Sequence, residues 1–273
     1  HELKKAGFHL DSLRVEDELS LRIALKNTWD IALCDYTMPT LNGLEALAIV
    51  REINQDIPFI FVSGTIGEDV AVEAMRTGAQ DYILKGSFKR LAPAVERELN
   101  ELEHRRMRRE AEKRLHFLAL YDELTGLPNR NYFRQHLKKA LVEANKSRRQ
   151  LTLACVNLDR FKTVNGSLGY DAGNLLLVQV AERLQRCVPA KATIARLAGD
   201  EFAILFRDLG DRNEITGAIE KILETIAEPF DIHGYMFYLG ASIGISIYPD
   251  DAIDVDKLMH NADIAVLSVK RDG

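Results

Sequence analysis

The sequence predicts two consecutive domains, an α/β domain with a doubly wound parallel sheet and an α+β domain, joined by a charged helix. In residues 12–104, short apolar runs alternate with amphipathic helical segments, which is typical of parallel strands with crossover helices. Residues 89–120 are helical in pattern and highly charged. Residues 121–273 place a hairpin and further strands between helices, which favours an antiparallel or mixed sheet with helices on one face. We therefore divide the chain into residues 1–88, 89–120 and 121–273.

The composition is that of an ordinary soluble globular protein of the cytoplasm. A net charge of -5 and a pI near 5.9 give no general attraction to nucleic acid or to an anionic membrane surface. No apolar run reaches membrane-spanning length, and no signal peptide or basic recognition helix is visible. Cys34, Cys155 and Cys187 are odd in number and lie in apolar contexts, which indicates free thiols. The histidines are scattered without ligand spacing, so they predict no metal site.

The first domain presents three polar residues at predicted strand ends. The apolar runs predict strands at 12–15, 30–35, 57–63 and 81–85, and the amphipathic segments predict helices at 19–27, 43–53 and 68–79. Sites in such sheets collect at the carboxyl ends of the strands. Asp35, Ser63 and Lys85 each end or follow one of the last three runs, so an acid, a hydroxyl and an ammonium are expected to meet at one edge.

These residues lie in DYTMPTLNG (35–43), FVSGT (61–65) and DYILKG (81–86), which together resemble response regulator receiver domains, with their flavodoxin-like sheet. The resemblance covers roughly the first hundred residues. It implies Asp35 as the phosphoacceptor, Ser63 as the hydroxyl that meets the phosphoryl oxygens, Lys85 as the counter-ion and Tyr82 as the rotating aromatic. It also implies a histidine kinase or another phosphodonor as a partner. A phosphoryl group adds charge that Ser63 and Lys85 bind in only one arrangement of their loops, so a two-state switch is expected.

Receivers also carry an acidic pair at the end of their first strand, which holds Mg²⁺. Glu16 and Asp17 imitate this pair, but only one helix separates them from the run before Asp35, where a helix, a strand and a second helix are required. We therefore interpret residues 12–15 as the second strand. The first strand is expected to be absent, with the chain beginning inside the first helix, and the C-terminal domain is expected to be truncated at its end.

The connector has an apolar seam that is interrupted. Apolar residues repeat at three- and four-residue spacing in its first half and return after RRMRRE: Leu91, Val95, Leu99, Leu102, Leu115 and Leu118. A solvated helix with one face on its own receiver accounts for the first half. The length also suits a helix that pairs with its twin, so a homodimer through the connector is the second interpretation.

The second domain predicts a hairpin whose tip carries two acids, in TIARLAGDEFAILF (193–206). The remaining pattern predicts a helix to about 146, a strand at 151–159, a loop at 160–173, helices at 174–188 and 214–230, a strand at 238–249 and a helix at 255–270. Asn157, Leu158 and Asp159 are expected beside the hairpin tip. Phe161 and Lys162 are expected to begin a loop whose amides face phosphates.

The stretches DELTGLPNR (122–130), NLDRFKTVNGSLGYDAGN (157–174) and RLAGDEF (196–202) resemble the GGDEF domain of diguanylate cyclases, with NADIAVLSVK (261–270) as a weaker fourth. The resemblance implies a nucleotidyl-cyclase-like palm in which each of two protomers holds one GTP and two divalent cations, such as Mg²⁺. It implies Asp200 and Glu201 as catalytic acids, and Asp200, the Leu158 carbonyl and position 157 as metal ligands. The nucleotide would be held by the backbone around Phe161 and Lys162, by Lys270 and, at its guanine, by Asn165 and position 174.

Three departures from that pattern stand at the site. Asn157 and Asn174 replace the metal-binding and guanine-reading aspartates, and Ala198 replaces the first glycine of GGDEF. An amide offers a hard cation a neutral oxygen, so Mg²⁺ affinity should fall at Asn157. Guanine presents two neighbouring hydrogen-bond donors, and a carboxylate can accept both. The amide of Asn174 accepts only one and presents its own donor to the other, so guanine should be bound less well at this position.

Two functions stay open on this reading. The first is a degenerate GGDEF domain that binds GTP weakly, or nothing, and regulates a partner or an EAL domain beyond residue 273. The second is an active diguanylate cyclase that makes cyclic di-GMP from two GTP under control of the receiver. The style of residues 159–169 and 228–251 resembles GGDEF domains that precede EAL phosphodiesterase domains, which favours the first.

Overall fold

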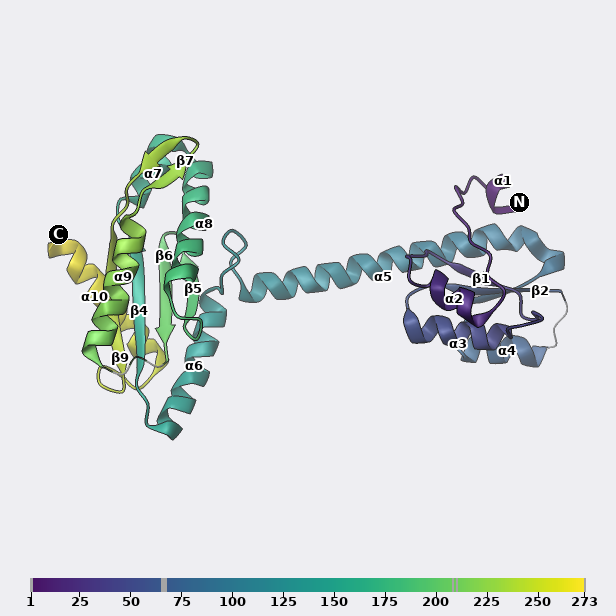
Figure 1. The fold of residues 1–273 in the computed structure, drawn as a ribbon, viewed down its shortest axis with the longest axis horizontal. Helices are drawn as coiled ribbons and strands as arrows, with labels where there is room; N and C mark the ends of the chain where they lie inside the picture. The colour runs from purple at the N-terminus through teal and green to yellow at the C-terminus, as the bar shows by residue number, and fades with distance from the viewer. Residues whose placement is uncertain (1, 65–67, 208, 210, 273) are drawn as a thin grey trace. The chain divides into compact units, whose positions relative to one another are not determined.

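The computed structural model describes residues 2–64, 68–207, 209 and 211–272, and the chain divides into two compact units, His1–Glu112 and Lys113–Gly273 (Figure 1). The predicted fold class, a parallel α/β unit followed by an α+β unit, is confirmed. In the described part of the chain, no helix combines the length and the apolar character needed to cross a membrane.

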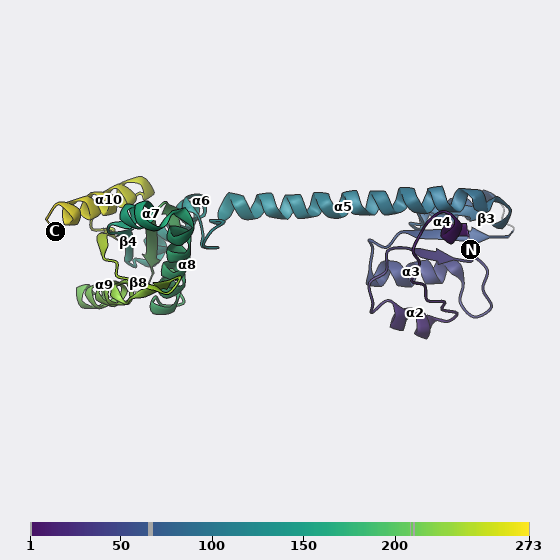
Figure 2. The same cartoon turned by 90° about the horizontal axis from the view of Figure 1, so that it is seen from above.

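The first unit is built on a parallel three-stranded sheet in the order β1 (Ala32–Cys34), β2 (Phe59–Ser63) and β3 (Asp81–Leu84). Its other elements are α1 (Glu2–Lys5), α2 (Glu18–Ala24), α3 (Gly43–Ile53), α4 (Glu68–Arg76) and a 3₁₀ turn, Lys85–Arg90. Phe59 and Phe61 pack against α2 and α3, whereas Ile60 faces the start of α5 (Leu91–Leu120), as the two-residue period of a strand requires. Figure 2 shows α3 and the start of α5 on opposite faces of this sheet. Both faces of the sheet are therefore covered.

Helix α3 begins where its sequence provides a cap. Asn42 accepts the Leu44 N–H at 3.0 Å, and Glu45 accepts the Asn42 N–H at 3.1 Å, which forms a capping box. A Cβ at Gly43 would lie 2.7 Å from the Phe61 ring and 3.0 Å from the Asp35 carbonyl. Glycine therefore lets α3 start directly beside Asp35.

The strand expected at residues 12–15 is not formed, which corrects that assignment. Residues 12–15 are irregular and mostly exposed, and the sheet of the described residues has three strands. In this sheet type a second strand pairs with the first strand, and no described segment takes that place, so its backbone groups stay in water. Asp17 instead caps α2, accepting the Ser20 N–H at 2.7 Å.

Helix α5 continues for 30 residues across the division between the units. Leu91 and Val95 are buried in a core cluster of the first unit, which matches the expectation for the first half of the connector, and Leu102 is buried as well. Met107, Leu115 and Leu118 are exposed. Pairing of this helix with a second copy stays a prediction.

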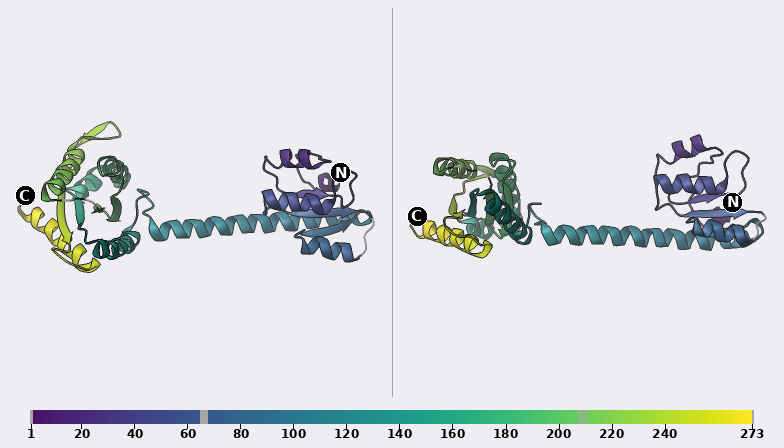
Figure 3. Two further views of the ribbon diagram at one scale, coloured as in Figure 1. Left: turned by 60° about the horizontal axis from the view of Figure 1, so that its bottom comes forward. Right: turned by 90° about the horizontal axis from the view of Figure 1, so that it is seen from below.

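The second unit contains an antiparallel sheet in the order β5 (Thr193–Ala198), β6 (Glu201–Phe206), β4 (Leu151–Leu158) and β9 (Ala241–Tyr248). Helices α6 (Arg130–Ser147) and α10 (Val255–Asp272) cover one face, and α7 (Phe161–Leu168), α8 (Tyr170–Cys187) and α9 (Arg212–Ala227) cover the other (Figures 2 and 3). The expectation of helices on one face was wrong. Strand β4 is apolar on both sides, with Leu153 and Cys155 facing one helical layer and Ala154 and Val156 facing the other.

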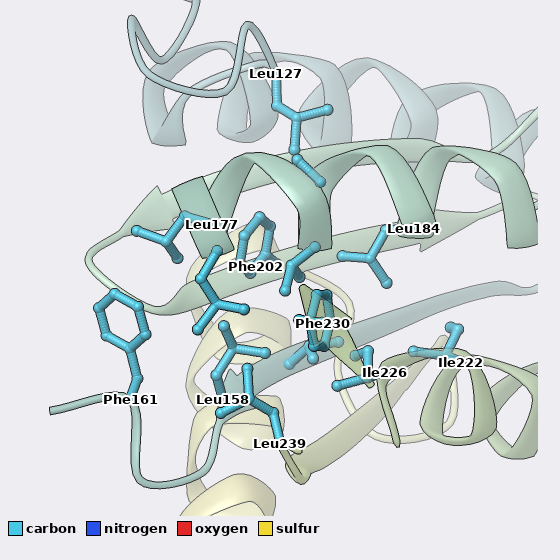
Figure 4. Close-up of a cluster of buried hydrophobic side chains, with 14 of the residues drawn as sticks. Leu127, Leu158, Phe161, Leu177, Leu184, Phe202, Ile222, Ile226, Phe230 and Leu239 are labelled. Carbon is cyan, nitrogen blue, oxygen red and sulfur yellow. The ribbon is translucent and has the colours of Figure 1, made fainter. Parts of the chain in front are cut away.

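Two further segments differ from the prediction. Residues expected as a loop at 160–173 form α7 and the first turn of α8, and Phe161 packs into the core beside Leu158 and Leu177 (Figure 4). After α9, residues expected to remain helical enter a small hairpin, β7 (Phe230–Ile232) and β8 (Tyr235–Phe237). Arg183 ends α9 by donating to the carbonyls of Thr225, Glu228 and Pro229.

Candidate functional site

The edge of the first sheet brings an acid and an ammonium into contact. Asp35 follows β1 and Lys85 follows β3, and Lys85 Nζ lies 2.6 Å from Asp35 Oδ2. Ser63 ends β2 between them and is 3 % exposed. Thr65, the last residue of FVSGT, lies outside the described residues. The three predicted switch residues thus stand at the ends of three adjacent strands.

Tyr82 lies on β3 and packs against the core that contains Phe59 and Phe61. Its hydroxyl is buried and has no hydrogen-bond partner. A buried hydroxyl without a partner is costly, so this placement of the ring is not held by a polar contact. A ring that no hydrogen bond holds in place is compatible with the predicted role of Tyr82 as a rotating aromatic.

The AGDEF turn is tight because of one glycine. Gly199 has φ 49°, in the left-handed region, whereas Ala198 is not among the residues with positive φ. Alanine at 198 is therefore unstrained. Across the sheet, Asn157 is the register partner of Glu201, and the Leu158 N–H donates to the Asp200 carbonyl at 3.2 Å. Residues 157–158 therefore lie beside the two acids, where the sequence placed them.

A clamp on this turn was missed by the sequence analysis. The Arg196 guanidinium donates twice to the Gly199 carbonyl, at 2.9 and 2.8 Å, and twice to the Asp122 carboxylate, at 2.9 and 3.1 Å. Burial disfavours the charged form of Asp122, but the hydrogen bonds from Thr125 and Arg196 outweigh it and lower its pKa. Asp122 begins the motif DELTGLPNR, and Arg196 begins the motif RLAGDEF. The opposite charges of these two residues were the only sign in the sequence that they could pair.

The side-chain amide of Asn157, which stands where the family pattern has an acid, accepts a hydrogen bond from a lysine. Lys270 Nζ, in the last turn of α10, donates to Asn157 Oδ1 at 2.5 Å. Glu201 has Arg130 at 3.7 Å. Among the described residues, no group of three or more His, Cys, Asp or Glu side chains is placed to hold a metal ion. A neutral oxygen bonded to an ammonium is a poor ligand for Mg²⁺, so position 157 does not fit its part of the predicted cation site.

Phe161 and Lys162 form the first turn of α7 rather than a loop, which corrects the expected backbone. Arg160 precedes them with φ 56° and provides no side-chain cap. Asp159 is fixed from both sides, donating its N–H to the Gly240 carbonyl at 2.9 Å and accepting the Ser242 hydroxyl at 2.8 Å. The start of α7 is thus anchored, with Lys162 exposed, and helix N-termini favour phosphate groups.

The two predicted guanine readers lie on neighbouring helices. Asn165 Oδ1 is buried without a hydrogen-bond partner, and a Cβ at Gly173 would lie 1.8 Å from it. A side chain at 173 would therefore displace the Asn165 side chain from its place between α7 and α8. Asn174, the next residue, is exposed in the first part of α8. The structure thus places the two asparagines at one helix junction.

Comparison with known families matches both units. The family described as diguanylate cyclase, GGDEF domain, matches residues 119–273, which is more than half of the chain. The response regulator receiver domain matches residues 2–96.

Two relatives from Pseudomonas aeruginosa illustrate the likeness. The bifunctional diguanylate cyclase/cyclic di-GMP phosphodiesterase MucR is 40% identical over 163 residues, which cover 60% of this chain and 24% of MucR. The cyclic di-GMP phosphodiesterase NbdA is 34% identical over 175 residues, which cover 64% of this chain and 22% of NbdA. The match thus spans about a quarter of the length of each relative.

A solved structure shows the same fold. The GGDEF domain of TpbB from Pseudomonas aeruginosa is 36% identical, covers 56% of this chain and 90% of the TpbB chain, and superposes with a TM-score of 0.55. Sequence, sheet order and comparisons agree. The chain belongs to the GGDEF diguanylate cyclase family and carries a response regulator receiver domain before its GGDEF domain.

Proposed function

We propose that this chain is a phosphorylation-controlled signalling protein of cyclic di-GMP pathways whose GGDEF domain binds GTP as a regulatory ligand and converts it, at most, slowly. The observation that carries this proposal is the hydrogen bond from Lys270 to Asn157. It stands where the family pattern has a carboxylate for a divalent cation. A neutral amide engaged by an ammonium does not recruit that cation.

Low turnover follows from the charge that the reaction requires. In-line phosphoryl transfer depends on cations that offset charge on the attacking and leaving oxygens. Loss of one such electrostatic element typically lowers the rate by about 10² to 10³. Asp200 and Glu201 stay at the turn, but an acid that accepts a proton from a ribose hydroxyl does not replace the missing charge.

Binding of GTP rests on groups that remain in place. Lys162 is exposed at the start of α7, and Lys270 lies in the last turn of α10. The oxygen of Asn165 is buried without a hydrogen-bond partner, so it would accept from a guanine donor after the side chain turns outward. Asn174 presents a donor as well as an acceptor, so discrimination of guanine from other bases should be weak.

Control of the molecule is assigned to Asp35. Its carboxylate is the acceptor of the phosphoryl group from a histidine kinase or a small phosphodonor. A phosphoryl group on Asp35 would compete for Lys85, now 2.6 Å away, and would accept from the Ser63 hydroxyl. The loops after β2 and β3 would then be drawn to the new group, and Tyr82 would follow.

The output is assigned to a partner or to a further domain. Both relatives are named for phosphodiesterase activity, and the segment shared with this chain covers 24% of MucR and 22% of NbdA. A GGDEF domain that senses GTP for an EAL-type phosphodiesterase fits this setting. Homodimerisation through α5 would bring two such units together.

A cyclase assay on the full chain tests the proposal. Purified protein is given GTP and Mg²⁺, with and without acetyl phosphate, and cyclic di-GMP is measured by chromatography. We expect little or no product in either condition, and partial recovery in an Asn157→Asp, Asn174→Asp double variant. Robust turnover by the unmodified chain that is lost in Asp200→Ala would contradict the proposal and establish the alternative, an active diguanylate cyclase. That alternative has its own support, because the relative TpbB, 36% identical over 154 residues, is named a diguanylate cyclase.

A further inference from the structure

We infer that the Lys270 ammonium takes the place of a divalent cation at Asn157, so that this GGDEF domain binds GTP without a divalent metal. The inference rests on the proposed function, which assigns GTP to this site, and goes beyond it by stating how the phosphates are neutralised.

The position of Lys270 is set by close packing of α10 on the sheet. A Cβ at Gly244 in β9 would lie 2.1 Å from the Ala262 carbonyl and 2.5 Å from the Val266 nitrogen. Only glycine lets the helix backbone approach the strand this closely. Lys270 is one helical turn beyond Val266, which is buried. The ammonium therefore comes from a fixed helix rather than from a loop.

The same packing places the helix next to position 157. In the β4–β9 register, Gly244 is opposite Cys155 and Ser242 is opposite Asn157. The contact that fixes α10 is thus only two residues along β4 from the amide that Lys270 reaches. The hydrogen bond between Lys270 Nζ and Asn157 Oδ1 measures 2.5 Å.

The charges around the turn favour an anion more than the family pattern does. Asp200 and Glu201 are the acids at the turn, and Glu201 lies 3.7 Å from Arg130. Asn157 adds no negative charge to them. A carboxylate at 157 would neutralise Lys270 in an ion pair and repel the phosphates until a divalent cation arrived.

Asn157 leaves the charge of Lys270 available while still holding its position. An ammonium has three donors, and the bond to Asn157 uses one of them. The others can serve phosphate oxygens, together with the first-turn amides of α7 beside Lys162. Asn157 is thus a positioning residue for Lys270, and no metal is needed to bridge protein and nucleotide.

Titration calorimetry of the full chain with GTP tests this, once in Mg²⁺ and once in EDTA. For the unmodified chain we expect dissociation constants that agree within about threefold between the two conditions. In Asn157→Asp, binding in EDTA should weaken by about tenfold or more, and Mg²⁺ should restore it. Lys270→Gln should weaken binding in both conditions.

Lys257→Gln is the matched control, because Lys257 lies on the same helix, is exposed and pairs only loosely with Asp254, at 3.8 Å. It should leave both dissociation constants unchanged. Thermal unfolding of each variant shows whether the fold is retained. Asparagine and aspartate have nearly the same volume, so Asn157→Asp should not disturb the packing.

Two outcomes would overturn the inference. One is binding by the unmodified chain that disappears in EDTA, and the other is no GTP binding in either condition. The first outcome leaves the proposed function standing, whereas the second would also remove GTP as the regulatory ligand of the proposed function. Neither concerns turnover, which the cyclase assay measures separately. Conversely, rapid synthesis of cyclic di-GMP in Mg²⁺ would contradict the proposed function, while the EDTA titration would still decide the role of Lys270.

Discussion

The two units carry the same contact with different chemistry. In the receiver, Lys85 meets the carboxylate of Asp35 at 2.6 Å, and in the GGDEF domain Lys270 meets the amide of Asn157 at 2.5 Å. Both acceptors lie at or near the end of a strand, and both lysines come from a later part of the chain. A carboxylate is a nucleophile and an anion, whereas an amide is neither. We therefore expect phosphorylation to change the receiver contact and to leave the GGDEF contact as it is.

The largest expected effect breaks the receiver side of this comparison. Asp35→Asn should abolish phosphoryl uptake from acetyl phosphate, because an amide does not attack phosphorus. Uptake is measured by intact mass or by beryllofluoride binding. Asp30→Asn is the control. Asp30 is exposed just before β1, and its ion pair with Arg106 is long at 3.9 Å, so the change should disturb little. The acids that hold Mg²⁺ in receivers belong to the expected first strand, so the test uses the full-length protein. Uptake that persists there in Asp35→Asn, or fails there with Asp35 intact, would remove Asp35 as the phosphoacceptor.

The next effect makes the two contacts alike. Asn157→Asp turns the GGDEF contact into an ion pair and restores a carboxylate to the turn. Combined with Asn174→Asp, it should raise cyclic di-GMP synthesis by about 10² if one missing charge is the main defect. The measurement is initial rate at saturating GTP and Mg²⁺. No gain over the unmodified chain would show that the site is impaired elsewhere.

A smaller effect concerns the clamp between Asp122 and Arg196, whose side chains are 25% and 11% exposed. Arg196→Met removes the cationic partner of a half-buried carboxylate, which keeps only its hydrogen bonds from Thr125, and should destabilise the hairpin by about 2 to 3 kcal/mol. Hydrogen exchange in residues 193–206 reports this locally. The control is Arg212→Met, because Arg212 is exposed at the start of α9, outside the hairpin. Unchanged protection of the hairpin would show that the clamp contributes nothing.

The same clamp predicts a pH dependence. The pKa of Asp122 is lowered in the folded protein, so the unfolded chain binds its proton first as pH falls. The stabilisation is present above the unfolded pKa of an aspartate and is lost as pH falls through the lowered, folded value. Protection of residues 193–206 should decline over that acid range in the unmodified chain. In Asp122→Asn this decline should be reduced, and an identical profile would assign the acid sensitivity to other groups.

The smallest expected effect is an absence of product binding. Many diguanylate cyclases have Arg-x-x-Asp before the GGDEF turn, and this chain has Pro189-Ala190-Lys191-Ala192 there. Without a bidentate guanidinium and its acid, cyclic di-GMP has no strong anchor at this place. Calorimetry on the full chain should find no tight binding. Tight binding that survives changes at the AGDEF turn would contradict this.

Much of the fold follows from local pattern. The predicted helices at 43–53 and 255–270 match α3 and α10, and the hairpin at 193–206 matches β5 and β6. Each of these has a periodicity and end signals within its own residues, such as the capping box of Asn42 and Glu45. The convergence of Asp35, Ser63 and Lys85 followed from one rule about parallel sheets. These features depend on short-range chemistry that a sequence displays directly.

Other features were decided only by packing. Residues 160–173 were expected to form a loop, but they form α7 and the first turn of α8, and Gly169, with φ 84°, separates the two helices. The strand expected at 12–15 needed a neighbour, and the helical coverage of both faces of the second sheet needed the placement of α6 and α10. In each case the residue pattern allowed two outcomes, and long-range contacts chose one.

The sequence by itself determined which chemical groups stand at the two sites. The receiver has a carboxylate, a hydroxyl and an ammonium. The GGDEF domain has two acids at its turn and two asparagines where the family pattern has aspartates. The tertiary structure decided which of these groups are already engaged. Arg196 reaches Asp122 across 74 residues and Lys270 reaches Asn157 across 113, and both contacts exist because helices and strands far apart in the chain are packed together. Closing such long loops costs entropy that only the assembled core recovers, so a local pattern does not predict them.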